Sequence, residues 1–209
     1  MASATNRTFR FLALGDSYTI GEAVSADERW PVLLATRLRQ SGIDVDDPLI
    51  VAQTGWTTDE LDAGIDAAKP RDTFDLVTLL IGVNNQYRGR SVDEYGLQFG
   101  GLLRRAIEFA GSRASRVIVV SIPDWGPTPF ARESGRDPAR IGVEIDAFNT
   151  VAEEAADRAG VQFVDITPGS KRAANDETLI ASDGLHPSRA MYEEWAEALF
   201  PVAFRALTS

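Results

Sequence analysis

Short apolar runs alternate with longer stretches of helical periodicity along most of the chain. Five compact runs of β-branched and aliphatic residues stand out, at 9–14, 49–52, 76–81, 117–122 and 161–165. Continuous apolar runs of this length, rather than alternating ones, are typical of strands that are buried on both faces. The pattern therefore predicts five buried strands.

The segments between these runs carry start and stop signals of helices. Capping boxes stand at Thr57–Glu60 and Ser91–Glu94, where a side-chain oxygen and a later glutamate satisfy free backbone amides. Asp137 before Pro138 predicts the start of a helix that ends at Gly160. A last helix is expected at about 188–207, with a core-facing stripe of Met191, Trp195, Leu199 and Val202.

Strands that alternate with helices predict a parallel sheet with helices on both faces. We therefore expect an α/β fold of three layers, α/β/α, with a five-stranded parallel sheet. The 209 residues show no repeat or linker and suit one domain over 1–209. Residues 123–138 are the longest stretch expected to be irregular, and loops of this kind often set specificity.

Polar residues gather where the predicted strands end. Gly15-Asp16-Ser17-Tyr18, Gln53-Thr54-Gly55-Trp56 and Gly82-Val83-Asn84-Asn85 follow the first three strands, and Asp183-Gly184-Leu185-His186-Pro187 lies beyond the fifth. Because the carboxyl ends of parallel strands meet at one edge of the sheet, these segments are expected to lie together and form a ligand site.

The residue types at this edge suit nucleophilic catalysis. A serine hydroxyl needs a neighbouring base, and His186 is the only histidine in a chain without cysteine. Asp183 precedes it by three residues, so its carboxylate is expected to orient the imidazole that activates Ser17. The backbone N–H groups of Ser17 and Gly55 and the amide of Asn84 are the expected donors to an oxyanion.

In these four blocks the chain resembles the SGNH, or GDSL, hydrolase family. The matching residues are Gly15-Asp16-Ser17, Gly55, Gly82-x-Asn84 and Asp183-x-x-His186-Pro187, in the family's order. The resemblance implies a flavodoxin-like fold, an acyl-serine mechanism on carboxylic esters, and no metal or other cofactor. Tyr18, Gln53 and Asn85 depart from the common family pattern at supporting positions.

Aromatic residues are concentrated in the predicted loops of the same edge. Two interpretations stay open, an apolar slot for the substrate and simple packing of loops on the sheet. The residues concerned are Tyr18, Trp56, Tyr87, Trp125 and Phe130.

Two alternative functions remain. A metal-dependent phosphoesterase would use Asp16, Asp183 and His186 as ligands, although one histidine with few clustered carboxylates is a poor metal-binding set. A non-catalytic binding module on the same fold is the other alternative. Each block taken alone also has a structural explanation as a turn or helix cap, so the hydrolase hypothesis rests on their combination.

Net charge and hydropathy limit the classes of binding partner that we expect. The net charge of −10 disfavours nucleic acid. No signal peptide and no membrane-spanning apolar run is visible in the sequence, so we expect a cytoplasmic protein that acts on a small ester. Acyl esters, lysophospholipids and acetylated sugars all fit, and the acyl length, a transfer to alcohols, a thioesterase side activity, the oligomeric state and the physiological role stay open.

Overall fold

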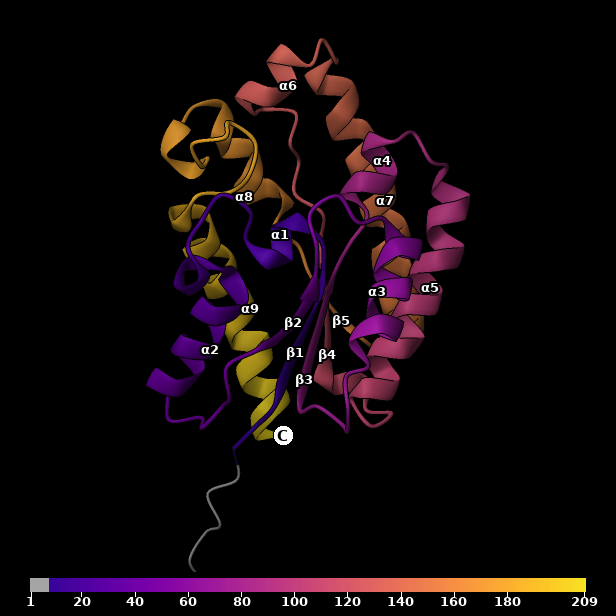
Figure 1. Cartoon of the computed structure of the whole chain (residues 1–209), viewed down its shortest axis with the longest axis vertical. Helices are drawn as coiled ribbons and strands as arrows, with labels where there is room; N and C mark the ends of the chain where they lie inside the picture. Colours follow the sequence, from indigo (N-terminus) through magenta and orange to yellow (C-terminus); the bar gives the residue numbers. More distant parts are fainter. Residues whose placement is uncertain (1–7) are drawn as a thin grey trace, which may run out of the picture.

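The computed structural model describes residues 8–209, which form a five-stranded parallel sheet between two layers of helices (Figure 1). The sheet order is β2-β1-β3-β4-β5. The strands are β1 (Phe11–Gly15), β2 (Leu49–Ala52), β3 (Leu76–Leu80), β4 (Val117–Val120) and β5 (Gln162–Val164). The chain moves outward from β1 in both directions, so the predicted three-layer fold is confirmed, and the order reverses between β1 and β3.

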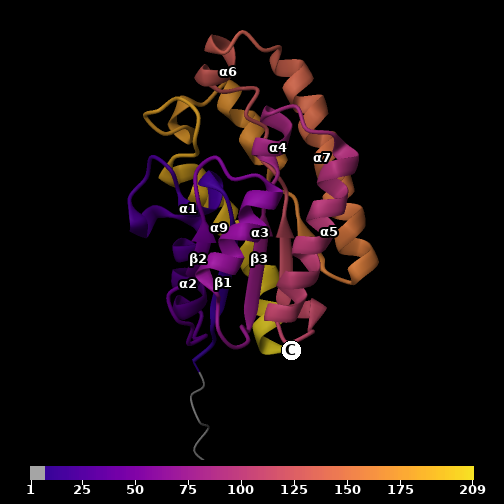
Figure 2. The ribbon, with the colours of Figure 1, turned by 45° about the vertical axis from the view of Figure 1, so that its right-hand side comes forward.

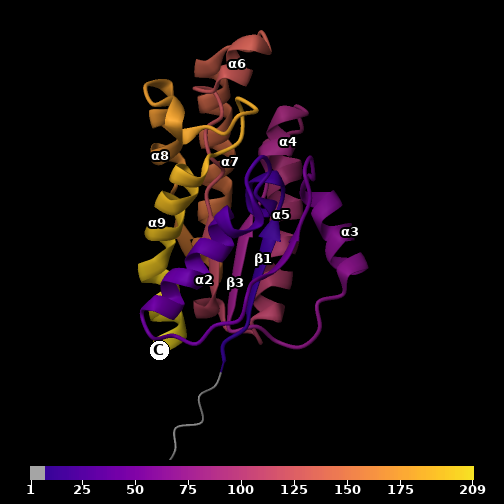
Figure 3. The ribbon, with the colours of Figure 1, turned by 60° about the vertical axis from the view of Figure 1, so that its left-hand side comes forward.

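Helices cover both faces of the sheet. Figure 3 shows α2 and α9 on one side and α3 and α5 on the other, and α7 packs along α5. The long helices are α2 (Trp30–Gln40), α3 (Thr58–Ala68), α5 (Val92–Phe109), α7 (Pro138–Ala159) and α9 (Arg189–Thr208). Short helices follow strands or lie in loops: α1 (Ser17–Ile20), α4 (Val83–Tyr87), α6 (Pro129–Glu133) and α8 (Thr167–Lys171), with 3-10 turns at Ala26–Glu28, Ala114–Arg116, Arg172–Ala174 and Glu177–Leu179.

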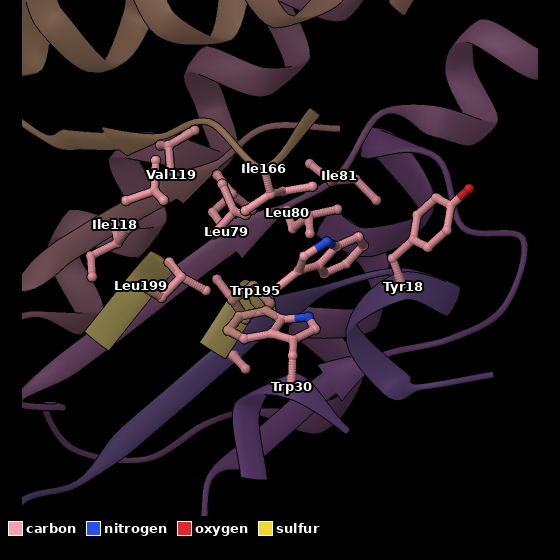
Figure 4. Close-up of a cluster of buried hydrophobic side chains, with 14 of the residues drawn as sticks. Tyr18, Trp30, Leu79, Leu80, Ile81, Ile118, Val119, Ile166, Trp195 and Leu199 are labelled. Carbon is pink, nitrogen blue, oxygen red and sulfur yellow. The ribbon is translucent and has the colours of Figure 1, made fainter. Parts of the chain in front are cut away.

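The core on the α2–α9 side is built around aromatic residues. Trp30 and Trp195 are at most 2% exposed, and the ring of Tyr18 lies edge-on to Trp195 at 6.1 Å (Figure 4). Of the predicted stripe on α9, Met191, Trp195 and Leu199 are buried, while Val202 is half-buried. The stripe therefore packs this helix on the sheet, directly beneath the segment that carries Ser17.

The predicted helix starts are confirmed in their main features. Thr57 and Glu60 form the expected reciprocal capping box of α3. Ser91 accepts a hydrogen bond from the N–H of Glu94 at the start of α5, and α7 runs from the cap Asp137 to Gly160, which has a φ of 67°. These caps fix where each helix leaves the loops at the carboxyl edge.

The structure differs from the expected elements in several places. The strands expected at 76–81, 117–122 and 161–165 are shorter, at Leu76–Leu80, Val117–Val120 and Gln162–Val164. Residues 123–138 are not irregular throughout, because Thr128 caps the short helix α6 and accepts the N–H of Ala131 at 3.2 Å. The first strand begins at Phe11, while Phe9 forms only an isolated bridge to Val45. Within the described residues, no helix has both the length and the apolar content needed to cross a bilayer.

Candidate active site

The segments singled out in the sequence lie at the carboxyl edge of the sheet, beside the switch in strand order. Ser17 begins α1 directly after β1, and Asn84 lies in α4 after β3. Figures 1 and 2 show α1 and α4 at the same end of the sheet, with α6 above them. This is where open α/β sheets bind ligands.

Ser17 is held in the first turn of α1. The preceding Asp16 caps this helix and accepts the N–H of Tyr18 at 3.0 Å. Ser17 is 5% exposed and borders an apolar hollow of about 190 Å³. The first N–H groups of a helix have no partner within the helix, so the Ser17 amide is placed to donate toward a ligand.

Asp183 and His186 form a close pair in the loop before α9. Oδ2 of Asp183 lies 2.6 Å from Nδ1 of His186, and Oδ1 accepts the backbone N–H groups of Leu185 and His186. Gly184 turns the chain between them with a φ of 72°. Since Nδ1 is engaged by the carboxylate, Nε2 is the free nitrogen of this ring.

Hydrogen bonding controls the charge of Asp183. Burial alone would raise its pKa, but the hydrogen bonds from the His186 ring and from the two backbone N–H groups outweigh burial and lower the pKa. The carboxylate is therefore ionised at neutral pH beside the imidazole. His186 itself is 8% exposed and borders the same hollow as Ser17.

Gly55 and Asn84 complete the polar side of the hollow. Both border it, and Gly55 has a φ of 87°, which an L side chain rarely adopts. Nδ2 of Asn84 donates to the carbonyl oxygen of Trp56 at 2.9 Å. This bond uses one of the two amide hydrogens and fixes the side chain, so the second hydrogen remains for a ligand.

Asn85 joins two helices beneath this site. Its Oδ1 accepts the N–H of Thr58, and its Nδ2 donates to the Thr58 hydroxyl at 2.7 Å. Asn85 is fully buried. The amide at this position thus ties α4 to the start of α3 and positions the neighbouring Asn84, whereas Gln53, the other departure in a neighbouring block, is exposed.

Asp16 has the opposite environment to Asp183. It is fully buried next to Ser17, and burial raises the pKa of its carboxyl from 3.8 to about 7. Hydrogen bonds from the N–H groups of Tyr18 and Gly82 oppose this shift without cancelling it. Asp16 therefore exchanges its proton near neutral pH.

Four of the five aromatic residues border the hollow, and one does not. Tyr18, Tyr87, Trp125 and Phe130 all line it, and Tyr18 lies edge-on to the His186 ring at 5.7 Å. The ring of Trp56 lies instead against Gly64 of α3, where an added Cβ would overlap the indole. Trp56 contributes its carbonyl to Asn84 rather than a wall for a ligand, so we omit its side chain from the binding site.

Three further residues line the hollow that the sequence analysis did not single out as site residues: Thr54, Val83 and Leu185. Each is a direct neighbour in the chain of a residue that was singled out. The signal was therefore present, because residues that flank a site residue in a tight loop often border the same space.

Residues 13–194 match the model of the GDSL-like lipase/acylhydrolase family. The chain belongs to this family. Comparison with curated proteins gives no match.

Solved structures of several other proteins share the fold. TesA superposes with a TM-score of 0.72 at 20% identity, covering 95% of this chain and 99% of its own. The esterase EstA from Pseudoalteromonas sp., described as inhibited by monoethylphosphonate, gives 0.68 at 16% identity over 96% and 99%. The acetyl xylan esterase AlAXEase gives 0.70 at 14% identity over 92% and 98%. At these identities the likeness shows the fold alone.

Within residues 8–209, no three histidine, aspartate or glutamate side chains come together as a ligand set for a cation. The site is thus a serine, an aspartate–histidine pair and neutral donors around an apolar hollow.

Proposed function

We propose that this GDSL hydrolase cleaves carboxylic esters through an acyl intermediate on Ser17. The observation that carries the proposal is that His186, whose Nδ1 lies 2.6 Å from Oδ2 of Asp183, borders the same hollow as Ser17. A nucleophile, a base and a group that orients the base are the components that acyl transfer requires.

In the acylation step, Nε2 of His186 accepts the hydroxyl proton of Ser17 as Oγ bonds to the ester carbonyl carbon. Asp183 stabilises the imidazolium that forms and keeps the ring in the tautomer with hydrogen on Nδ1. The imidazolium then gives its proton to the alcohol oxygen as the ester C–O bond breaks. The alcohol leaves, and the acyl group stays on Ser17.

Water completes the cycle. His186 takes a proton from the water as its oxygen attacks the acyl carbon, and returns it to Oγ as the acyl–serine bond breaks. In both steps negative charge develops on the carbonyl oxygen, and the N–H groups of Ser17 and Gly55 with the free amide hydrogen of Asn84 are the proposed donors to it. These donors carry no net charge, so they do not retain the carboxylate product.

The alternatives have less support. A metal-dependent phosphoesterase lacks a ligand cluster among the described residues. A binding module would have no need of a hydrogen-bonded Asp–His pair beside a nearly buried serine. Structural neighbours include an acetyl xylan esterase, which favours small esters as a starting point for assays.

Replacing Ser17 with alanine tests the proposal. We expect Ser17→Ala to lower kcat for p-nitrophenyl acetate by at least roughly a thousandfold, because the covalent route is lost. Ser41→Ala is the matched control, since Ser41 is an exposed serine that caps α2 and should keep full activity.

A phosphonate reagent gives an independent readout. Since the neighbour EstA is described as inhibited by monoethylphosphonate, a fluorophosphonate probe should label Ser17 in the wild type, as mapped by peptide mass spectrometry. A Ser17→Ala protein that keeps more than a tenth of wild-type activity, or labelling at another residue only, would refute the proposal.

A further inference from the structure

Tyr87 separates two hollows of different character. On one side is the apolar hollow of about 190 Å³ that holds Ser17 and His186. On the other is a more polar hollow of about 500 Å³, rimmed by Arg88, Arg136 and Arg140. Tyr87, the last residue of α4 and 39% exposed, borders both, so this residue lies at the partition between them.

The partition is part of an aromatic wall from three separate segments. The ring of Tyr87 lies 5.6 Å from that of Trp125 and 6.4 Å from that of Phe130. Trp125 is itself fixed, because its Nε1 donates to Oε1 of Gln86 at 2.9 Å. Figure 2 shows how α4, which carries Tyr87, lies below α6, which carries Phe130. The wall is therefore a packed unit.

Arg136 holds Tyr87 from the far side. Its guanidinium carbon lies 4.4 Å from the centre of the Tyr87 ring and 5.7 Å from that of Trp125. One of its nitrogens also donates to the backbone carbonyl of Tyr87 at 2.6 Å. A cation stacked on an aromatic face and bonded to the same residue restrains both ring and backbone.

The size of the apolar hollow limits what fits on the serine side. An apolar cavity of about 150 Å³ holds one benzene molecule, that is, about six carbon atoms. With about 190 Å³, the hollow at Ser17 accommodates an acyl group of similar size. The hollow is open to solvent on one side, and Tyr87 lies on its border with the polar hollow, so a longer chain directed along that border meets Tyr87.

We infer that Tyr87 determines the acyl length that this enzyme accepts, restricting it to short acyl groups, and that Arg136 is a positioning residue that holds Tyr87 closed. The inference rests on the proposed ester hydrolysis at Ser17. It commits the substrate class to esters of short-chain acids, with the acyl group against the wall of Tyr87, Trp125 and Phe130.

A chain-length series tests the inference. We would measure kcat/KM for p-nitrophenyl acetate, butyrate, hexanoate, octanoate and decanoate. Wild type should hydrolyse decanoate at least about tenfold less efficiently than butyrate, although each methylene that gained burial would favour binding by roughly fourfold. Tyr87→Ala joins the two hollows and should raise the decanoate-to-butyrate ratio at least tenfold.

Tyr87→Phe is the matched control because it keeps the ring and should preserve the wild-type ratio within twofold. A smaller rise in Tyr87→Ala, or a wild type that accepts decanoate as well as butyrate, overturns the inference. If circular dichroism shows that Tyr87→Ala is unfolded, Tyr87→Leu replaces it under the same criterion, because leucine shortens the side chain and keeps an apolar contact.

Separate variants test whether Arg136 positions Tyr87. Arg136→Ala should raise the ratio at least threefold, and Arg136→Lys, which keeps a cation over the ring, should restore it toward the wild-type value. Arg158→Gln is the control, since Arg158 pairs with Glu154 near the end of α7 and is not among the residues that border either hollow. An unchanged ratio in Arg136→Ala removes the positioning role.

Labelling separates this test from that of the proposed function. We choose a fluorophosphonate probe with a methyl group on phosphorus, so that its reaction with Ser17 does not depend on the space beyond Tyr87. Normal labelling with an unchanged chain-length profile in Tyr87→Ala refutes the inference alone. Absent labelling of Ser17 in the wild type refutes the proposed function, and the inference with it.

Discussion

Two aspartates belong to the proposed site, Asp16 directly before Ser17 in the chain and Asp183 paired with His186, and their carboxyl groups have opposite environments. Asp16 is fully buried and its pKa is raised to about 7 by burial. Asp183 is about one-third exposed at its side chain, and hydrogen bonds lower its pKa. The two residues are of the same type at the same edge of the sheet, so their surroundings alone make the difference.

The difference shows where negative charge is useful in the site. At Asp183 the charge faces the imidazole at 2.6 Å, where in the proposed mechanism it would stabilise the imidazolium. At Asp16 the carboxyl accepts the N–H of Tyr18, which shapes the turn before Ser17, and this task needs an oxygen acceptor rather than a charge. We therefore propose that Asp183 acts in the reaction, and that Asp16 holds the backbone turn before Ser17.

The largest expected effect comes from removing the charge at Asp183. Asp183→Asn should lower kcat for p-nitrophenyl acetate by about 10⁴-fold, or about 5 kcal/mol, because the amide favours the wrong imidazole tautomer. Asp16→Asn keeps an oxygen acceptor for the Tyr18 amide and should lower kcat less than tenfold. Steady-state kinetics of both variants would measure these losses. Equal losses of kcat in Asp183→Asn and Asp16→Asn would contradict the different roles proposed for the two aspartates.

Some parts of this site can be predicted from the sequence and others cannot. The difference lies in how far apart in the sequence the interacting residues are. Asp183 and His186 are three residues apart across a glycine turn, so their contact is local and could be expected from spacing. Ser17, Gly55 and Asn84 follow strands of one parallel sheet, and topology alone brings those segments to the same edge.

Contacts between irregular segments could not be predicted in this way. The direction of the Trp56 side chain depends on the space left by Gly64, and the stacking of Arg136 on Tyr87 joins residues 49 positions apart. The burial of Asp16 could not be predicted either, since a polar residue after a strand gives no sign of how much of the fold covers it.

The second-largest expected effect is the contribution of Asp16 to the pH dependence of the free energy of unfolding. The folded pKa of Asp16 lies above its unfolded value of 3.8, so the folded state binds the proton more tightly. The free energy of unfolding should then fall as pH rises from about 4 to about 7, by at most about 4 kcal/mol from this residue. Urea denaturation across this range should show a smaller decline in Asp16→Asn.

The difference between wild type and variant isolates Asp16, because all other titrating groups are common to both proteins. Parallel pH profiles of the two proteins would mean that the buried carboxyl keeps an ordinary pKa.

The smallest expected effect is the contribution of Asp183 to the pH dependence of stability. It has the opposite sign to that of Asp16, because the free energy of unfolding falls as pH decreases. Its folded pKa is lowered, so its contribution to stability is complete above the unfolded pKa and is lost as pH falls through the folded value. Because the side chain is about one-third exposed, solvent screens the interaction and the loss is smaller than the change at Asp16. In urea denaturation from pH 5 down to pH 2, wild type should therefore lose more stability than Asp183→Asn. A variant that loses as much as wild type would show that the Asp183–His186 hydrogen bond serves catalysis without contributing to the stability of the fold.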